Sequence, residues 1–363
     1  MLARQTQSSA PYCVFITAID PMHEALRLQG FACSSLGSGL YAELIQGLAD
    51  DYVSGGITRG LLSGTSERPV HDAVPLRLLG ALHRLALMGH TPEVARHFPT
   101  TGGTCGDTLV ADCVSALGRH APYVAEALTG QVQTNEVARS IVPLVLARWL
   151  ATLGVRNYAH LEIGASAGLN LNFARYSADD GAVVMGDPSS TVRFGPEWFD
   201  HPPALPADTA VPIAVHGADP HPVDIGTDEG RRRLLSFIWP DQTERFERAQ
   251  AALEIALEHP VDVTRASADV WLARELPSRR GTPTMVFHSI VWQYLGTEVQ
   301  DALRDTLATE GERATVSSPL VWARMEPAGR VADVRATVWR GGDPEEHVLA
   351  EIGFHGRDLN WRD

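Results

Sequence analysis

The chain has 363 residues, of which 44% are hydrophobic and 20% are charged, so it is long enough for one large domain or two closely packed ones. Its formal net charge of -14 argues against nonspecific nucleic-acid binding, which requires a concentrated basic surface. The chain contains Arg but no Lys, and this excludes a Walker P-loop, a Schiff-base lysine and a Ser-Lys dyad.

The N-terminal third is expected to be helical. Residues 1–20 are interpreted as a poorly ordered leader, and residues 21–130 as an α-helical lobe or lid. Apolar residues recur there every three or four positions, most clearly at 76–89 and 108–128. The apolar run at 13–19 is too short for a signal peptide, and no run is long enough to span a bilayer. We therefore expect a cytoplasmic protein.

Residues 131–363 are predicted to form an α/β domain. A helix is expected over 131–154, kinked at Pro143, and it leads directly into a strand. Short β-like runs then alternate with helical segments, a pattern typical of a mostly parallel sheet covered by helices. The last two runs lie a short turn apart and predict an antiparallel hairpin at the sheet edge. A Gly- and Pro-rich insertion at about 177–212 is expected to fold over the carboxyl edge of the sheet. The expected strands lie at 158–164, 212–219, 261–269, 284–292, 317–326, 331–342 and 345–356.

The stretch LEIGASAGLNL at 161–171 has two interpretations. As E-x-G-x-x-x-G, with Glu162, Gly164 and Gly168, it predicts a turn that presents backbone N–H groups to a nucleotide-like cofactor. Asp219 and Asp269 are expected to close the next two strands, where they would bind a ribose and an adenine amino group. This order of features matches S-adenosylmethionine, and the sheet resembles that of Rossmann-like methyltransferases. Ser166 stands where the middle glycine of that motif is usual, and Ser289 is a further candidate contact.

As G-x-S-x-G, the same stretch would be a nucleophile elbow with Ser166 as the nucleophile. Asp333 and His355 follow in the required chain order and could complete a triad. The acid two residues before the first glycine is unusual for an elbow, and no H-G-G oxyanion segment precedes it. A purely structural glycine turn is the third interpretation.

A dense polar run precedes the apolar helix that leads to the first strand. Thr134 or Asn135 is expected to cap this helix. The alternative is that the run reaches the pocket, with Asn135 and Arg139 in catalytic positions and Gln133 and Glu136 contacting substrate.

Further candidates follow the glycine turn and the later strands. His288 or Tyr294 could act as the base that takes a proton from a nucleophile, although His288 could equally be a core histidine. Arg175 could hold a carboxylate through a bidentate contact. The remaining candidate substrate contacts are Asn170, Tyr176, Glu326 and His355.

His216, Asp219, His221 and Asp224 could in principle form a metal cluster, because His and Asp are common Zn or Fe ligands. Pro220 and Pro222 keep the segment extended, so neighbouring side chains point apart. We therefore expect no metal.

Several blocks together resemble the bacterial family called domain of unknown function 2332, over roughly residues 25–363. The family implies a methyltransferase-like fold. The matching blocks are VQTNEVARS (132–140), LEIGASAGLNLNFARY (161–176), HGADPHPVDI (216–225), FIWPDQTERFERAQAAL (237–253), VFHSIVWQYL (286–295) and FHG (354–356).

The first functional hypothesis is a small-molecule enzyme that transfers methyl from S-adenosylmethionine to an N or O nucleophile, mainly by alignment. The second keeps the fold without the cofactor and catalyses elimination or ring-closing displacement of an anionic leaving group in natural-product biosynthesis. The third is a hydrolase with Ser166 as nucleophile, and the fourth is a noncatalytic binding subunit. The expected partner is a small-molecule or carrier-protein-bound substrate rather than nucleic acid or membrane, with a homo-oligomer or a small partner subunit left open.

Overall fold

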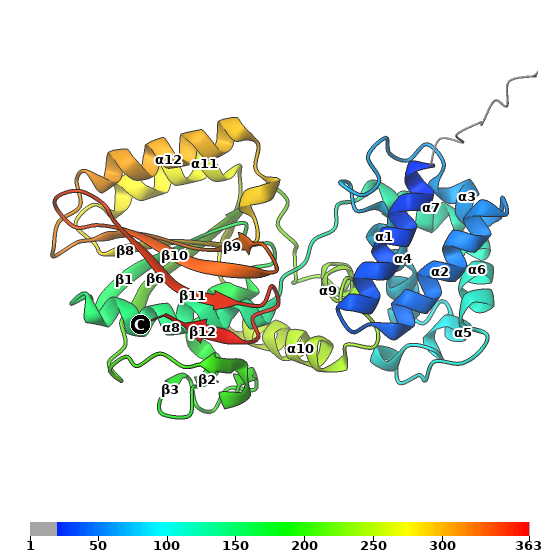
Figure 1. The fold of residues 1–363 in the computed structure, drawn as a ribbon, viewed down its shortest axis with the longest axis horizontal. Helices are drawn as coiled ribbons and strands as arrows, with labels where there is room; N and C mark the ends of the chain where they lie inside the picture. Colours follow the sequence, from blue (N-terminus) through cyan, green and yellow to red (C-terminus); the bar gives the residue numbers. More distant parts are fainter. Residues whose placement is uncertain (1–19, 363) are drawn as a thin grey trace, which may run out of the picture. The chain divides into compact units, whose positions relative to one another are not determined.

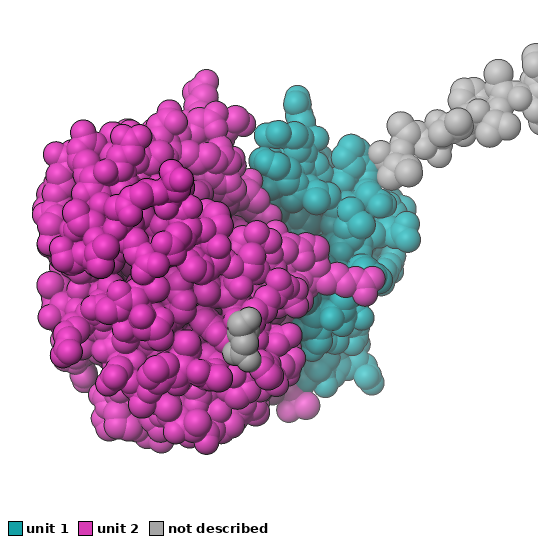
Figure 2. All heavy atoms as spheres, turned by 60° about the vertical axis from the view of Figure 1, so that its left-hand side comes forward, with its two compact units in different colours: residues 1–82, 105–131 teal, residues 83–104, 132–363 magenta. Residues whose placement is uncertain are grey.

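The computed structural model describes residues 20–362, which divide into two compact units. The leader expected at residues 1–20 lies, apart from Asp20, outside the described residues. Within the described range, the first unit comprises residues 20–82 and 105–131, and the second comprises residues 83–104 and 132–362 (Figure 2). The boundary after residue 82 falls inside helix α4 (Val74–Leu87). Among the described residues, no helix combines the length and apolar character needed to cross a membrane.

The first unit is helical. Asp20 caps α1 by accepting hydrogen bonds from the backbone N–H groups of Met22 and His23. The predicted helical run at 108–128 forms two helices, because Pro122 begins a new helix after residue 120. Besides the start of α4, the helices of this unit are α1 (Pro21–Ser35), α2 (Gly39–Val53), α3 (Ile57–Leu62), α6 (Leu109–Arg119) and α7 (Ala121–Thr129).

The second unit is built on a nine-stranded mixed sheet in the order β5-β12-β11-β10-β9-β8-β1-β6-β7. Strands β7, β6, β1, β8 and β9 are parallel to one another, and β9 to β12 form antiparallel pairs. The predicted C-terminal hairpin is confirmed, although two short strands lie beyond it. The strands are β1 (Asn157–Ile163), β5 (Phe199–His201), β6 (Val211–Asp219), β7 (Val263–Arg265), β8 (Thr284–Ser289), β9 (Leu320–Ala328), β10 (Val331–Trp339), β11 (Glu345–Ile352) and β12 (Leu359–Trp361).

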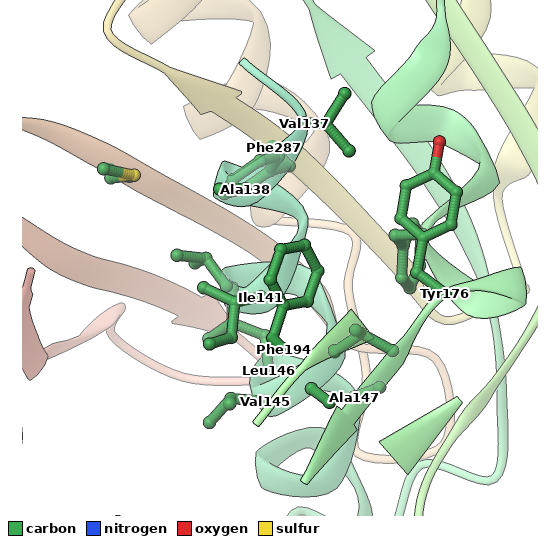
Figure 3. Packing of buried hydrophobic residues seen from close by; sticks show 14 of the residues in the cluster. Val137, Ala138, Ile141, Val145, Leu146, Ala147, Tyr176, Phe194 and Phe287 are labelled. Atoms are coloured by element: carbon green, nitrogen blue, oxygen red, sulfur yellow. The ribbon is translucent and has the colours of Figure 1, made fainter. Parts of the chain in front are cut away.

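Helices cover both faces of this sheet (Figure 1). On one face, α8 (Ile141–Thr152) and α10 (Thr243–Glu258) pack on a large apolar core. On the other, α11 (Ala268–Glu275) and α12 (Thr297–Gly311) enclose a second core. Residues 141–150 of α8 are all buried, which explains why every one of them except Arg148 is apolar. Figure 3 shows Val145 and Ala147 of α8, together with Phe194, among the side chains of the first core.

Three sequence expectations differ from this architecture. The helix expected over 131–154 begins only at 137, as the 3-10 turn η2 (Val137–Ser140) followed by α8. Pro143 therefore lies in the first turn of α8, where its missing N–H costs no internal hydrogen bond and no kink is needed. Strand β7 ends at Arg265, so Asp269 does not close a strand. It lies in the first turn of α11, because Ser267 and the following residues form a helix start.

The insertion at about 177–212 forms a small sheet in the order β3-β2-β4 (Val184–Gly186, Ser177–Asp179 and Arg193–Phe194). It is anchored on α8 by the buried Arg148, which pairs with Asp180 and donates from Nε to the carbonyl of Pro206 at 3.1 Å. Farther along, β5 joins the main sheet beside β12. These anchors lie on α8 and at the sheet edge, rather than over the carboxyl ends of the central strands.

Candidate functional site

The order of the parallel strands points to one place for a site. From β1 the chain continues to β6 and β7 on one side, whereas β8 is followed by β9 on the other. Strands β1 and β8 are therefore parallel neighbours at which the direction of the winding reverses. In open α/β sheets, ligands bind outside the carboxyl ends of the strands at such a reversal.

The glycine turn after β1 is held by hydrogen bonds within the protein. Tight backbone turns of this kind can present N–H groups to an anionic ligand. Here, five N–H groups of the turn already have protein acceptors, so they are not available to a ligand. The N–H groups of Gly164 and Ala165 donate to the carbonyl of Ala218, and that of Gly168 donates to the carbonyl of Ala165. The N–H of Ser166 donates to the carboxylate of Asp219, and the N–H of Leu169 donates to Oδ1 of Asn135.

Packing explains the two glycines of this turn. A Cβ on Gly164 would lie 2.6 Å from Cγ2 of Val291, and one on Gly168 would lie 2.8 Å from Cγ2 of Val263. Both glycines also have positive φ, as does Ser166, at +54°. A serine in this region is strained, and Oγ of Ser166 is buried without a hydrogen-bond partner among the described residues.

A second strained residue lies at the end of β8. Ile290 has φ of +51°, which is exceptional for a β-branched residue. The loop that it begins is held by Glu326, whose Oε1 accepts from the backbone N–H groups of Val291 and Trp292 at 3.0 and 3.2 Å. The two adjacent strand ends thus each carry a strained residue other than glycine, a feature that clusters at functional sites.

Asp219, predicted to bind a ribose, is engaged by the protein. Its Oδ2 accepts from the N–H of Ser166 at 3.0 Å. Its Oδ1 accepts from the N–H of His221 at 2.8 Å and from Nε2 of Gln133 at 3.4 Å. In this conformation, Asp219 and Gln133 tie the glycine turn to the segment after β6.

Arg139 lies at the reversal point itself. Its Nε donates to the carbonyl of Phe354 at 3.0 Å, and its Nη1 to the carbonyl of Ser289, at the end of β8, at 3.4 Å. Burial lowers the pKa of its guanidinium, whereas the charges of Glu136 and Glu326 raise it. Among the described residues, no carboxylate lies within 4.0 Å of the guanidinium. Arg139 therefore keeps N–H donors that no protein anion neutralises.

Glu162, near the end of β1, is a buried acid beside this arginine. Only 3% of the residue is exposed, and no hydrogen bond from the described residues reaches its carboxyl group. Burial raises the pKa of Glu162 to about 8, although the charge of Arg139 opposes the shift. A buried acid and a half-buried arginine thus lie at the same strand ends without forming a close ion pair.

His288, the predicted base, has both ring nitrogens occupied. It is fully buried, with Nδ1 2.7 Å from Oε1 of Glu326 and Nε2 accepting from Nε1 of Trp322 at 3.0 Å. The expectation of a core histidine therefore fits this conformation better than that of a base, because no ring nitrogen can reach a substrate. Oε2 of Glu326 is buried without a hydrogen-bond partner among the described residues. Tyr294, also predicted as a base, is 73% exposed.

The polar run before α8 behaves differently from a simple cap. Glu136, not Thr134 or Asn135, caps η2 by accepting from the N–H of Ala138. Glu136 also pairs with Arg245 and lies 3.3 Å from Nδ1 of His355. Although burial raises the pKa of Glu136, Arg245 and His355 lower it well below its usual range. A small pocket borders this cluster, lined by Thr134, Asn135, Glu136, Val137, Leu234, Phe237, Ile238, Arg245 and Ala249.

Of the remaining predicted residues, Asn170 and Tyr176 are buried, whereas Arg175 and Asp269 are not. Asn170 and Tyr176 are buried supports, since Nδ2 of Asn170 donates to the carbonyl of Glu136 at 3.2 Å and the Tyr176 hydroxyl to the carbonyl of Leu169 at 2.5 Å. Arg175 is exposed. Asp269 accepts a hydrogen bond from Ser267, the N-cap residue of α11. Sequence analysis did not single out Arg245 of α10, although this residue lies within the block 237–253 that resembles the family.

Neither the hydrolase triad nor the metal cluster is assembled. The hydrolase interpretation needs Ser166, Asp333 and His355 to form a hydrogen-bonded chain, but Asp333 accepts from Arg335 and His355 lies against Glu136. No hydrogen bond joins the three within the described range, because each proposed partner is already engaged elsewhere. In residues 20–362, no group of three or more His, Cys, Asp or Glu residues is arranged to hold a metal ion.

Comparison with known proteins defines a family. The chain belongs to the family described as uncharacterized protein conserved in bacteria (DUF2332), whose model matches residues 23–361. Neither a curated protein nor a solved structure matches the chain.

Proposed function

We propose that this protein is an enzyme acting on a small molecule bound at the carboxyl ends of β1 and β8, on a Rossmann-like frame. Its parallel strands follow the order 3-2-1-4-5 when numbered among themselves, which is the order of doubly wound sheets. The sheet does not end at the parallel strand β9. Strands β10 and β11 extend it as an antiparallel meander. The strand order supports the position of the site, and the side chains support its chemistry.

The observation that carries the proposal is the pair formed by Arg139 and Glu162. A guanidinium has five N–H donors, and Arg139 uses two nitrogens on backbone carbonyls, so it retains donors for a ligand carboxylate. Glu162 offers a carboxyl group to an amine. A molecule with a carboxylate near an amine, as in an amino acid, would satisfy the half-buried Arg139 and the buried Glu162 at once.

Methyl transfer is the first reaction that we propose for this site. S-adenosylmethionine carries an amino-acid head group, and when bound it would supply an electrophilic methyl group to an N or O nucleophile. Arg139 would hold the carboxylate of that head group and Glu162 its amine, and the strand ends would align the substrate. The nucleoside part fits less well, because Asp219 is engaged by Ser166 and His221.

This engagement of Asp219 favours a second candidate at the same site. The N–H groups of the glycine turn are also bonded within the protein, so the usual partners of a nucleoside are already taken. An amino-acid-like substrate without a nucleoside would need only Arg139 and Glu162. Elimination or intramolecular displacement of an anionic leaving group from such a substrate is the reaction of this second candidate.

Calorimetric titration with L-methionine and with S-adenosylmethionine tests both candidates. We expect both ligands to bind to the wild-type protein and to bind at least tenfold more weakly to Arg139→Met, since a charge-assisted bidentate contact contributes more than about 1.4 kcal/mol. Arg175→Met is the matched control, because Arg175 is exposed and should leave binding unchanged. Binding of methionine alone would favour the second candidate. If neither ligand binds at millimolar concentration, the proposed head-group site is wrong.

A further inference from the structure

His160, on β1, is a buried polar residue that the proposed function does not use. It is fully buried, and neither ring nitrogen has a hydrogen-bond partner among the described residues. Its ring packs among aromatic side chains, with centroid distances of 4.8 Å to Phe173, 6.0 Å to Phe287 and 6.4 Å to Tyr158. An unsatisfied imidazole in such surroundings lowers stability, so its position calls for a physical reason.

The neighbouring acid supplies that reason. Glu162 follows two residues later on the same strand, so both side chains point to the same face of the sheet. Nε2 of His160 lies 4.0 Å from Oε2 of Glu162. Hydrogen bonds between such atoms are about 2.8 Å long, so rotation of the Glu162 carboxyl group can close the gap without moving the strand.

We propose that Glu162 and His160 share one proton, and that through this pair Glu162 is the proton donor and acceptor of the site. In the protonated state, the carboxylic acid of Glu162 donates to Nε2 of His160, whose other nitrogen carries the ring proton. On ionisation the pair releases one proton to water: the Nδ1–H bond of His160 breaks, Nε2 takes the proton of the Glu162 carboxyl, and Nε2–H then donates to the carboxylate. His160 is the positioning residue in both states. The role in catalysis rests on the proposed function, whereas the proton sharing itself does not.

The surroundings favour the neutral pair near pH 7. Burial raises the pKa of Glu162 to about 8 and lowers that of His160 to about 3. Arg139 is the cation that faces Glu162, and it favours the carboxylate. Tyr176 also faces Glu162, and burial raises the pKa of its hydroxyl, which keeps it neutral. A single positive charge acting against full burial leaves Glu162 able to gain or lose its proton near neutral pH.

This pair gives the amine of the ligand a defined protonation state. When an ammonium group lies beside ionised Glu162, an N–H bond of the ligand breaks and an O–H bond forms on Glu162. The products are a neutral amine and a carboxylic acid, so the opposite charges cancel in a site that solvates charge poorly. A neutral amine has the lone pair that ring-closing displacement, the reaction of the second candidate, requires.

Nitrogen NMR of ligand-free, isotopically labelled protein tests the proton sharing between about pH 6 and pH 10. We expect the two ring nitrogens of His160 to exchange their protonated and unprotonated signatures at the pH where the infrared band of a protonated carboxyl disappears. In Glu162→Gln, both the band and the tautomer change should be absent. Tyr158→Phe is the matched control, since its hydroxyl has no hydrogen-bond partner among the described residues and the tautomer change should persist.

Two results would overturn the inference. One is a His160 tautomer that stays constant while Glu162 titrates, because the two groups would then not share a proton. The second is a Glu162 that remains ionised throughout this range. Neither result depends on a ligand, so failure here is distinguishable from failure of the methionine and S-adenosylmethionine titrations.

Discussion

Replacing Glu162 with Gln should stabilise the protein, and increasingly so as the pH rises. In the folded protein the pKa of Glu162 is raised to about 8 from an ordinary value of 4.5. The folded state therefore binds this proton more tightly than the unfolded chain, and the contribution of Glu162 to stability falls as the pH rises from about 4.5 to about 8. At about 1.4 kcal/mol for each unit of pKa, the raised pKa destabilises the folded state by about 1 kcal/mol at pH 5, 3 kcal/mol at pH 7 and 5 kcal/mol at pH 9.

Chemical denaturation of both proteins at these pH values measures the effect. Gln cannot ionise, so the stability of the variant minus that of the wild type should grow with pH, while the contributions of all other groups cancel. Glu136→Gln gives a contrast of opposite sign. Arg245 and His355 hold the pKa of Glu136 low, so this variant should be less stable than wild type at neutral pH, with the loss shrinking as the pH falls below about 4.5. A difference for Glu162→Gln that stays constant between pH 5 and pH 9 would refute the reasoning.

Four further variants, at three positions, test the glycine turn. Asn135→Ala should cost about 1 to 3 kcal/mol of stability, measured by denaturation, because the N–H of Leu169 loses its acceptor; unchanged stability would restore a purely substrate-positioning role. Ser166→Gly should raise the melting temperature by relieving about 1 to 2 kcal/mol of strain at φ of +54°, whereas Ser166→Ala should not raise it. A fluorophosphonate probe, which labels nucleophilic serines, should not label Ser166. Asp219→Ala should lower stability by about 1 to 3 kcal/mol even without ligand, and an unaffected melting curve would show that its hydrogen bonds to the turn contribute little.

Much of the fold of the second unit could be predicted from local pattern. Apolar runs followed by turns predicted β1, β6, β8 and β9, and alternation predicted the hairpin of β10 and β11, because burial on one or two faces leaves a direct record in residue order. The strand expected at 261–269 was overextended. Its last four residues can begin a helix as well as end a strand, and tertiary packing decides between these states.

The candidate site could be predicted only in part. Position along the chain indicated that Arg139 and its polar neighbours could reach the pocket, because they precede the helix that leads into the strand of Glu162. The roles of side chains could not be predicted, since they depend on which backbone groups fold against them. Asp219 lies at the end of β6, as expected, but its carboxylate accepts a hydrogen bond from the N–H of Ser166. The ring of His288 is held by Glu326 and Trp322.

The strongest argument for function at the ends of β1 and β8 is that several costs to stability coincide there. Ser166 and Ile290 have backbone conformations that cost about 1 to 3 kcal/mol each. Glu162 is an acid buried against its tendency to ionise, and at neutral pH this costs about 3 kcal/mol. These amounts are large beside a total folding stability of about 5 to 15 kcal/mol. A fold optimised for stability alone would place such groups elsewhere or omit them. Their concentration at one pair of strand ends, beside an arginine with unneutralised donors, is what a site built to bind a charged molecule requires.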